Sequence, residues 1–401
     1  MTDFTIASFN VKNLIGADQE YYRFQSYTPE EYAWKKDWLS DQLLTMDADI
    51  VGFQEVFEEG ALSDVVDETT QRARELNNVV IPDKTKRYRK RAIFRRLASD
   101  GYAGAEIAFA PNAADGGTPG KRRPGVAILS RHPILETEII QDLPEPLVID
   151  FPALRGMGGD GGRYTLERVS RPILKARIQV GSEVITVFNC HLKSKLGEFI
   201  TPESDDFPPE ADLTHYDPVA RALGGLRAAL RRMAEAYVLR RAIVAEIKAG
   251  RCVIAMGDFN DGENAVSSEI VSGEHPFKNY AWMLRHDATH GGDRYSREED
   301  KQIRGDVEAV KLYSAEKLFV RKSLRDMVFT AAFGGNFESI DQIYLSRHFH
   351  PENPNRIGEM TYFSVLNDHL TDGSHPEAPY NKLASDHGQI VAHMSLAHDD
   401  R

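Results

Sequence analysis

Carboxylate, amide and imidazole side chains occur in this sequence at the ends of apolar, strand-like runs. The run CVIAMGDFND ends in Asp258 and Asn260, and three other runs end in Asn10, Glu55 and His191. Carboxylate oxygens are ligands that suit Mg²⁺ or Mn²⁺, and carboxylates and imidazoles can accept or donate protons. Together these residue types could bind a divalent cation and hydrolyse a phosphate ester.

Two later runs begin, instead of ending, with residues of the same kind. Asp341 opens one of them, and Asp386 and His387 open the other. If the earlier strands run in one direction and the later two run in the opposite direction, all of these side chains meet at one edge of a sheet. The order of the residues therefore predicts one site built from distant parts of the chain.

Each of these residues alone has an ordinary explanation. Gly-Asp-Phe-Asn is compatible with a turn whose side chains bond their own backbone, and a lone His191 would be a buried histidine with satisfied hydrogen bonds. Glu55 fits such an explanation least, because a half-buried carboxylate needs a partner or a cation. The occurrence of the whole set at matching strand ends favours a functional site.

Strands and helices must hold these residues in place, and both patterns are present. Runs rich in β-branched and aromatic residues recur, among them FTIASF, DIVGF, GVAILS, VITVFNC, CVIAM and GQIVAHMSL. One helix is expected from the N-cap candidate Thr28 and Pro29 to about Met46, and a second from about Pro218 to Lys248. The segment VAILSRHPILETEII is typical of a hairpin. Helices and hairpins together indicate mixed sheets covered by helices.

The composition is that of an ordinary globular protein, with 41% hydrophobic and 27% charged residues. No apolar run is long enough to cross a bilayer and the start has no leader-like pattern, so we expect a cytoplasmic protein without membrane insertion. Cys190 and Cys252 lie in strand-like runs and are expected to be buried thiols. The net charge of −12 argues against a protein that holds nucleic acid by bulk electrostatics, but it does not exclude a nucleic-acid substrate.

Six segments that contain the candidate residues resemble, in order, the signature segments of the endonuclease/exonuclease/phosphatase (deoxyribonuclease-like) superfamily. They are SFNVKNL, VGFQEV, NCHLKSK, MGDFND, SIDQIYLS and ASDHGQI. The resemblance implies an α/β fold, a four-layer sandwich in which two packed mixed β-sheets are flanked by helices. It also implies a single domain over residues 1–401, with insertions at about 60–125, 195–220 and 262–325.

The resemblance assigns roles to the candidate residues and implies Mg²⁺ or Mn²⁺ as the cofactor. The metal region would consist of Asn10, Glu55 and Asp386. The catalytic residues would be a histidine that faces the phosphate, the aspartate that orients it, a second histidine, and two residues that position the attacking water and the phosphoryl oxygens: His387, Asp341, His191, Asp258 and Asn260. The sequence leaves open whether His387 or Asp258 takes the proton from the water.

Two specialised branches of the superfamily are not supported. Abasic-site endonucleases usually carry an acid at the position of Lys12 and an aromatic-arginine pair at the position of Glu338 and Ser339. Inositol polyphosphate phosphatases favour Trp-Cys-Asp-Arg where this chain reads Ser-Ile-Asp-Gln, residues 339–342. The residues therefore support the superfamily and no particular branch of it.

The basic residues of the sequence are the ones that indicate what the substrate is. The segment KTKRYRKRAIFRR, residues 84–96, is either a tract that follows a phosphate backbone or a solvated helix face. Lys121, Arg122 and Arg123 either contact the substrate or belong to a solvated loop, and Arg171 either lies near the phosphate or caps an acidic loop. In a chain this acidic, the tract favours the functional interpretation.

The function expected from these residues is that of a nuclease acting on DNA or RNA, with nucleic acid as its partner. The alternative is a phosphatase or phosphodiesterase for a small phosphorylated metabolite or lipid headgroup, which would show a weaker dependence on salt. A non-enzymatic binding scaffold ranks last, because no expected catalytic residue is missing. The sequence does not indicate an oligomeric state.

Overall fold

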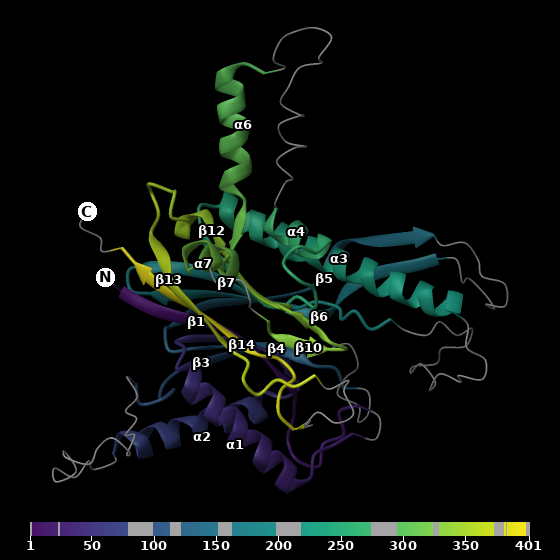
Figure 1. Cartoon of the computed structure of the whole chain (residues 1–401), viewed down its shortest axis with the longest axis vertical. Helices are drawn as coiled ribbons and strands as arrows, with labels where there is room; N and C mark the ends of the chain where they lie inside the picture. Colours follow the sequence, from purple (N-terminus) through teal and green to yellow (C-terminus); the bar gives the residue numbers. More distant parts are fainter. Residues whose placement is uncertain are drawn as a thin grey trace.

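The structure, a computed structural model of the chain, contains two large β-sheets with helices on their outer faces (Figure 1). The residues it describes are 2–22, 25–78, 99–112, 122–150, 163–197, 218–273, 295–323, 329–372, 381 and 383–397. Each large sheet has six strands, so the two sheets supply most of the regular structure that positions the candidate residues.

The first sheet gathers strands from both ends of the chain. Its order is β13-β14-β1-β2-β4-β3, with β1 (Thr2–Leu14), β2 (Ile50–Val56), β3 (Glu106–Ala110), β4 (Gly125–Ser130), β13 (Gly358–Leu366) and β14 (Gln389–Leu396). β1 and β2 run parallel, and β14 runs antiparallel to β1. The first and last strands of the chain therefore lie side by side (Figure 1).

The second sheet is formed by the middle of the chain. Its order is β5-β6-β7-β8-β12-β9, with β5 (Ile134–Asp150), β6 (Arg163–Val180), β7 (Glu183–His191), β8 (Cys252–Asp258), β9 (Leu312–Ser314) and β12 (Asp341–Ser346). β7 and β8 run parallel, and β12 runs antiparallel to β8. A small hairpin of β10 (Ala331–Phe333) and β11 (Asn336–Glu338) and a 3₁₀ turn, η5 (Arg347–Phe349), flank β12.

Apolar side chains pack between the sheets and between each sheet and its helices. The core between the sheets includes Ile6, Ile128, Val187 and Ile254, all fully buried. A second core joins the first sheet to α1 (Pro29–Met46) and α2 (Glu59–Asn77), and a third joins the second sheet to α3 (Pro218–Lys248) and α4 (Val266–Ser272). Because each amphipathic face is buried against a neighbour, the layers stack in the order helix, sheet, sheet, helix. The predicted four-layer α/β sandwich is confirmed.

The ends of α1 follow from its sequence. Thr28 accepts a hydrogen bond from the amide of Glu31, and the Glu31 carboxylate accepts one from the amide of Thr28, which is a capping box. Pro29 lies in the first turn, where its missing N–H is not needed. The predicted helix to Met46 is confirmed, as is the long helix from Pro218 to Lys248. Both cysteines are buried and free, as expected.

The predicted hairpin VAILSRHPILETEII is wrong, because its two halves belong to different sheets. Its first half is β4 and its second half is the start of β5. β4 is paired on one side with β2 and on the other with β3, so no edge is left for β5. The turn at residues 131–133 crosses between the layers, since the amide of Arg131 donates to the carbonyl of Asp49 and the carbonyl of Pro133 accepts from Gln179.

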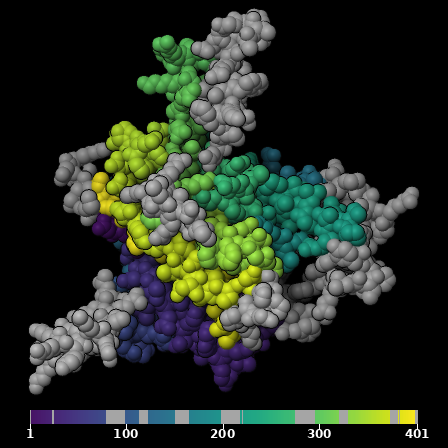
Figure 2. Space-filling view, viewed as in Figure 1, coloured from purple at the N-terminus to yellow at the C-terminus, as the bar shows by residue number. Residues whose placement is uncertain are grey.

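The segment 262–325 contains α4, α6 (Arg297–Ala309), β9 and α7 (Ala315–Ser323) in its described parts. α6 buries none of its residues and projects from the body of the molecule (Figure 2). The range 60–125 contributes most of α2, together with β3 at the edge of the first sheet. A single domain with three insertions stays a prediction.

Among the described residues, no helix is long and apolar enough to cross a membrane.

Candidate active site

The strand directions bring the predicted residues to one edge of the two packed sheets. Within the second sheet, Asp258 at the end of β8 is in register with His191 on β7 and with Asp341 on β12. Asn10 lies on β1 of the first sheet, and its side-chain amide Nδ2 is 3.1 Å from Oδ2 of Asp258. The expected arrangement, with the later two strands opposite in direction to the earlier four, is confirmed.

Asp258 lies at the centre of the site and receives hydrogen bonds from both sheets. Its carboxylate accepts from the backbone amide of Asn260 at 2.8 Å, from Nδ2 of Asn260 at 3.2 Å and from Nδ2 of Asn10 at 3.1 Å. Nε2 of His191 lies 3.2 Å from Oδ2. Burial raises the pKa of Asp258 to about 7, the positive charge of His387 counteracts this rise, and the negative charge of Asp341 adds to it.

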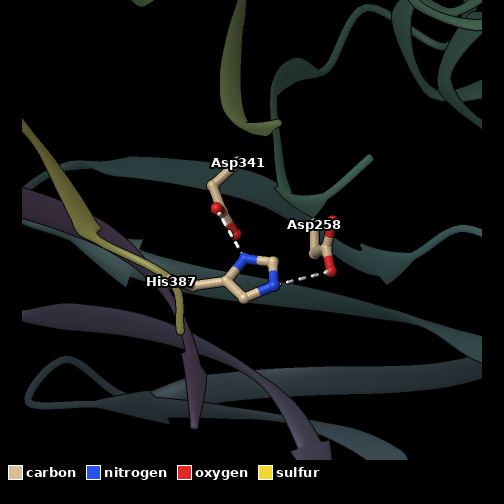
Figure 3. A group of neighbouring side chains, drawn as sticks. All are labelled: Asp258, Asp341 and His387. Atoms are coloured by element: carbon tan, nitrogen blue, oxygen red, sulfur yellow. Dashed lines mark hydrogen bonds and ion pairs between the residues drawn. The ribbon is translucent and has the colours of Figure 1, made fainter. Parts of the chain in front are cut away.

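The imidazole of His387 lies between two carboxylates (Figure 3). Its Nδ1 is 2.8 Å from Oδ2 of Asp341, and its Nε2 is 3.8 Å from Oδ2 of Asp258. Burial disfavours the charged imidazolium, but the charges of Asp341 and Asp258 outweigh burial and raise the pKa of His387 well above its ordinary value. The imidazole is therefore positively charged at neutral pH.

Backbone and hydroxyl contacts fix both partners of this pair. The amide of Asp341 donates to Oγ1 of Thr330, and the amide of His387 donates to Oγ of Ser385 at 3.0 Å. Oγ of Ser385 donates in turn to the carbonyl of Asn10, which ties the histidine to β1. In the described part of the chain, Oδ1 of Asp341 is buried without a hydrogen-bond partner.

His191 is held in the opposite charge state. Burial and the positive charge of Arg171 lower the pKa of His191 well below its ordinary value, so its imidazole is neutral. Nε2 of this neutral ring faces Oδ2 of Asp258 at 3.2 Å, and Nδ1 is buried with no hydrogen-bond partner among the described residues. The site therefore combines one charged and one neutral imidazole around a single carboxylate.

The ends of β1 and β2 carry strained backbone. Glu55, Lys12 and Asn13 have φ of 64°, 50° and 56°, in the left-handed region that favours glycine. Oε2 of Glu55 accepts from the amide of Asn13 at 3.0 Å, and Oε1 accepts from Nδ2 of Asn10 at 3.4 Å. Strain of this kind in non-glycine residues concentrates at functional sites. Here it turns the Glu55 carboxylate toward Asn10.

Two groups of side chains could accommodate a divalent cation. Ligand atoms of Asp258, Asp341 and His387 lie within 4.8 Å of one another, but Asp258 is occupied by several donors and His387 by Asp341. Oε1 of Glu55 has a long hydrogen bond from Asn10 as its partner among the described residues. A hard carboxylate oxygen with spare accepting capacity fits Mg²⁺ or Mn²⁺, so the donor set at Glu55 suits the cation better.

The remaining metal residue of the prediction, Asp386, lies at the surface. Its side chain is 55% exposed, and its Oδ2 is 3.7 Å from Nζ of Lys12. Asp386 precedes His387 directly, and its negative charge contributes to the raised pKa of that histidine. The structure thus brings together all eight residues predicted for catalysis and metal binding: Asn10, Glu55, His191, Asp258, Asn260, Asp341, Asp386 and His387.

The predicted substrate contacts divide into two groups. Arg171 is near the site, because its Nη1 donates to the carbonyl of Leu192 at 3.4 Å and its charge acts on His191. The pKa of Tyr22 is raised to about 12, first by burial and then by the negative charge of Glu55. The positive charges of Arg171 and Arg123 counteract this rise. Arg122 instead donates to Glu58 and Gln19. Lys121 and the basic tract 84–96 lie outside the described residues.

The long helix α3 supports the site through two residues that sequence reasoning missed. The buried carboxylate of Glu235 accepts from the amides of Ser170 and Lys193 at 2.6 and 2.7 Å. Arg232 donates to the carbonyl of Lys193 and to Oδ2 of Asp261. These contacts hold the middle of β6, which carries Arg171, and the segments that follow β7 and β8, next to His191 and Asn260. The helix is rich in arginine and alanine, and no sequence signal distinguishes Glu235 within it.

A buried lysine near the metal region was also missed, although a signal for it exists. Lys35 is fully buried on α1, and its Nζ donates to the carbonyl of Leu383 at 3.0 Å. Lys35, Leu39 and Leu43 are spaced four residues apart, so the lysine lies on the buried stripe of the helix. A charged residue in line with such a stripe predicts a buried charge with a specific partner.

Comparison with known protein families gives a match over nearly the whole chain. The model of the Endonuclease/Exonuclease/phosphatase family matches residues 7–387, a range that includes every predicted site residue. A search of curated proteins gave no match.

Solved structures of similar proteins share little sequence with this chain. An endonuclease/exonuclease/phosphatase family protein from Bacteroides thetaiotaomicron is 14% identical, covers 99% of this chain and 99% of its own, and gives a TM-score of 0.46. Truncated TDP2 from Caenorhabditis elegans is 14% identical, with 98% of each chain covered and a TM-score of 0.44. The catalytic domain of human Nocturnin is 13% identical, with 98% of this chain and 95% of that chain covered and a TM-score of 0.41.

Proposed function

Because the chain belongs to the endonuclease/exonuclease/phosphatase family, whose members are phosphoric ester hydrolases, we propose that it is a divalent-metal-dependent phosphodiesterase acting on DNA or RNA. The observation that carries this proposal is the position of His387 between Asp341 at 2.8 Å and Asp258 at 3.8 Å. Hydrolysis of a phosphodiester requires neutralisation of the phosphoryl oxygens and an activated water. The pair of charged groups meets both requirements.

His387 supplies positive charge and a hydrogen-bond donor. Asp341 fixes the ring by accepting from Nδ1, so Nε2–H, 3.8 Å from Oδ2 of Asp258, is the donor that would face a phosphoryl oxygen. Nδ2 of Asn10 and of Asn260 add neutral donors close to the same carboxylate. Donors that are held in place before the substrate arrives do not need to reorganise during the reaction, which makes each of them effective.

Asp258 is the group that we assign as the base for the attacking water. His387 already carries its proton at neutral pH and cannot accept another, whereas Asp258 has a pKa of about 7. A general base is most effective when its pKa lies near the working pH, because it is then both ionised and basic. The proton of the water therefore goes to the carboxylate of Asp258.

The cation would be held by Glu55, at the end of β2, with Asn10 beside it. When bound there, Mg²⁺ or Mn²⁺ supplies positive charge to the phosphate and polarises it toward attack. The prediction that Asp386 belongs to the metal region is retained as an outer position, because its carboxylate is paired with Lys12. Glu55 is the carboxylate whose neutralisation depends most on the cation.

Basic groups near the site support a nucleic-acid substrate. Arg171 and Arg123 both lie within electrostatic range of Tyr22, so positive charge and an aromatic ring occur together beside Glu55. Phosphate backbones are bound by arginine and lysine, and bases stack on aromatic rings. The basic tract 84–96 concentrates eight basic residues in a chain whose net charge is −12. These features favour a polyanion over a small phosphomonoester.

A panel of substrates tests the proposal. Plasmid DNA, oligonucleotides, RNA, bis(p-nitrophenyl) phosphate and phosphomonoesters would be incubated with the protein and Mg²⁺ or Mn²⁺, each with a chelator control. We expect diester cleavage that depends on the metal, and nucleic-acid binding that weakens steeply with salt. Cleavage of monoesters alone would instead support a phosphatase for small metabolites.

A further inference from the structure

An ammonium group occupies the outer part of the metal region. Nζ of Lys12 lies 3.7 Å from Oδ2 of Asp386, and the Lys12 side chain is 14% exposed. The position of this lysine is fixed by the site itself, because its backbone has φ of 50° and its amide donates to Oδ1 of Asn10 at 3.0 Å. Lys12 therefore points a permanent positive charge at a carboxylate that would otherwise be available to a cation.

A second lysine lies behind the first. Lys35 is fully buried beneath the loop that leads to Asp386, and Nζ donates to the carbonyl of Leu383 and lies 5.6 Å from the ring centre of Tyr27. Burial and the charge of Lys12 lower the pKa of Lys35 to about 7, while Glu55 and Asp386 raise it. The carboxylates of Glu55 and Asp386 and the amines of Lys12 and Lys35 therefore interact electrostatically within this small region.

The charges in this region leave little room for a second dication. A divalent ion bound by Asp386 would displace the Lys12 ammonium from its carboxylate and place two positive charges close together. A divalent ion at Glu55 meets no such competitor, because Glu55 accepts from the neutral groups Asn10 and Asn13. Binding of a divalent cation therefore costs more free energy at Asp386 than at Glu55.

We propose that Lys12 is a resident cation that occupies Asp386 and limits the site to one divalent ion, held at Glu55. The inference rests on the proposed function only in taking Glu55 as a metal ligand. Lys12 supplies permanently part of the positive charge that a second ion would otherwise bring to the phosphate. Removal of this lysine frees Asp386, and the freed carboxylate then adds to the cation site.

Binding of Mn²⁺ to protein stripped of metal, measured by titration calorimetry and by electron paramagnetic resonance of free Mn²⁺, tests the inference without a substrate. We expect one Mn²⁺ per wild-type chain. Lys12→Met should bind Mn²⁺ about tenfold more tightly, a change equivalent to about 1.4 kcal/mol. Lys12→Glu should bind a second ion. The matched control is Lys36→Met on α1, which removes a lysine paired with Glu68 and should leave Mn²⁺ binding unchanged.

A double variant distinguishes two causes of a gain in Mn²⁺ affinity: the freed carboxylate of Asp386, and the general loss of a positive charge. In Lys12→Met/Asp386→Asn the gain in affinity should disappear, because the carboxylate that Lys12 had occupied is gone. Circular dichroism of each variant establishes that it is folded.

Several results would overturn the inference. These are two ions in the wild-type protein, unchanged affinity in folded Lys12→Met, and a gain that persists in the double variant. One bound ion in a protein that cleaves no substrate of the panel would contradict the proposed function and leave this inference intact.

Discussion

The pKa values of the neighbouring groups Asp258 and His387 are both raised, but for different physical reasons. Burial raises the pKa of Asp258 to about 7, whereas the charges of Asp341 and Asp258 overcome burial and raise the pKa of His387. Pairs whose environments shift them in this way are suited to act as base and acid in one reaction. The neutral His191, whose Nε2 lies 3.2 Å from Oδ2 of Asp258, completes the set without adding charge.

The pH dependence of kcat/KM follows from these two shifts. Asp258 must be ionised to accept a proton, so activity rises with pH through about 7. His387 must be protonated, so activity falls again at a pH well above the ordinary value for histidine. The measurement is a pH profile of diester cleavage at saturating metal, and a bell shape is expected.

The variant Asp341→Asn tests whether His387 controls the alkaline limb of this profile. The carboxylate of Asp341 is the strongest contributor to the raised pKa of His387, so its removal should move the alkaline limb to lower pH. The acid limb should also move to lower pH, because the negative charge of Asp341 contributes to the raised pKa of Asp258. An alkaline limb that stays in place in a folded variant would show that a group other than His387 controls it.

Residue types and their order were sufficient to predict which side chains come together at the candidate site, because each of them stands at one end of an apolar run. The partners of that set were not predictable from the sequence. Ser385, Thr330 and Gln54 are small polar residues whose contacts depend on strands distant in sequence. Their role follows from register and not from local pattern.

At the scale of elements, α3 holds the middle of β6 and the segment after β7 through a pair of charged residues. Glu235 binds the amides of Ser170 and Lys193, and Arg232 binds the carbonyl of Lys193, so the peptide of Lys193 is fixed at both of its polar groups. Buried backbone amides need such partners. The helix therefore stabilises the fold and also sets the position of Arg171, the residue that follows Ser170.

Glu235→Gln should weaken substrate binding more than turnover. The amide side chain keeps one acceptor oxygen and loses the charge, so β6 shifts at Ser170 and Arg171 and KM rises, with a loss of stability of about 1–3 kcal/mol. Steady-state kinetics and urea unfolding measure the two effects.

The control for this variant is Glu246→Gln on the same helix, where a buried glutamate binds Lys175, Thr186 and Arg251 away from the site. It should lose stability while keeping the wild-type KM. An equal rise of KM in both variants would show that Glu235 has only a structural role.

Periodicity predicted most elements, and its failure at one turn has a physical cause. Amphipathic and alternating patterns indicate which residues are buried. These patterns predicted both long helices and the main strands. Pairing depends on which strand edges are free. β4 has no free edge, so the run after residues 131–133 joins the other sheet despite its hairpin-like sequence.

At the scale of the whole molecule, the site exists only when the two sheets are packed. Asn10 and Glu55 come from the first sheet, and His191, Asp258 and Asp341 come from the second. Asn189 of β7 joins the sheets beneath the site, because its Nδ2 donates to the carbonyls of Phe53 and Ala127 and its Oδ1 accepts from Gln54. The order of segments along the chain predicted the convergence, but it did not predict which sheet supplies each group.

Asn189→Ala should destabilise the protein by at least about 2 kcal/mol, since each buried polar group left unpaired costs ~1–3 kcal/mol. Because Gln54 precedes Glu55, loss of its partner should also weaken Mn²⁺ binding. Urea unfolding and Mn²⁺ titration measure these effects, with Asn336→Ala on the exposed hairpin as control. Wild-type stability in the variant would contradict the role of Asn189 as the link between sheets.

The central claim is that Asp258 and His387, with a cation at Glu55, carry out phosphodiester hydrolysis. The most direct measurement is the rate of oligonucleotide or bis(p-nitrophenyl) phosphate cleavage by wild-type, Asp258→Ala and His387→Ala proteins, with Mn²⁺ and with chelator, and with Asp300→Ala on α6 as control. We predict that chelator abolishes wild-type cleavage, that each site variant folds but loses about 10²–10³ in rate, and that the control is unchanged. Near-normal cleavage by either folded site variant, or by the wild-type protein with chelator, would contradict the account.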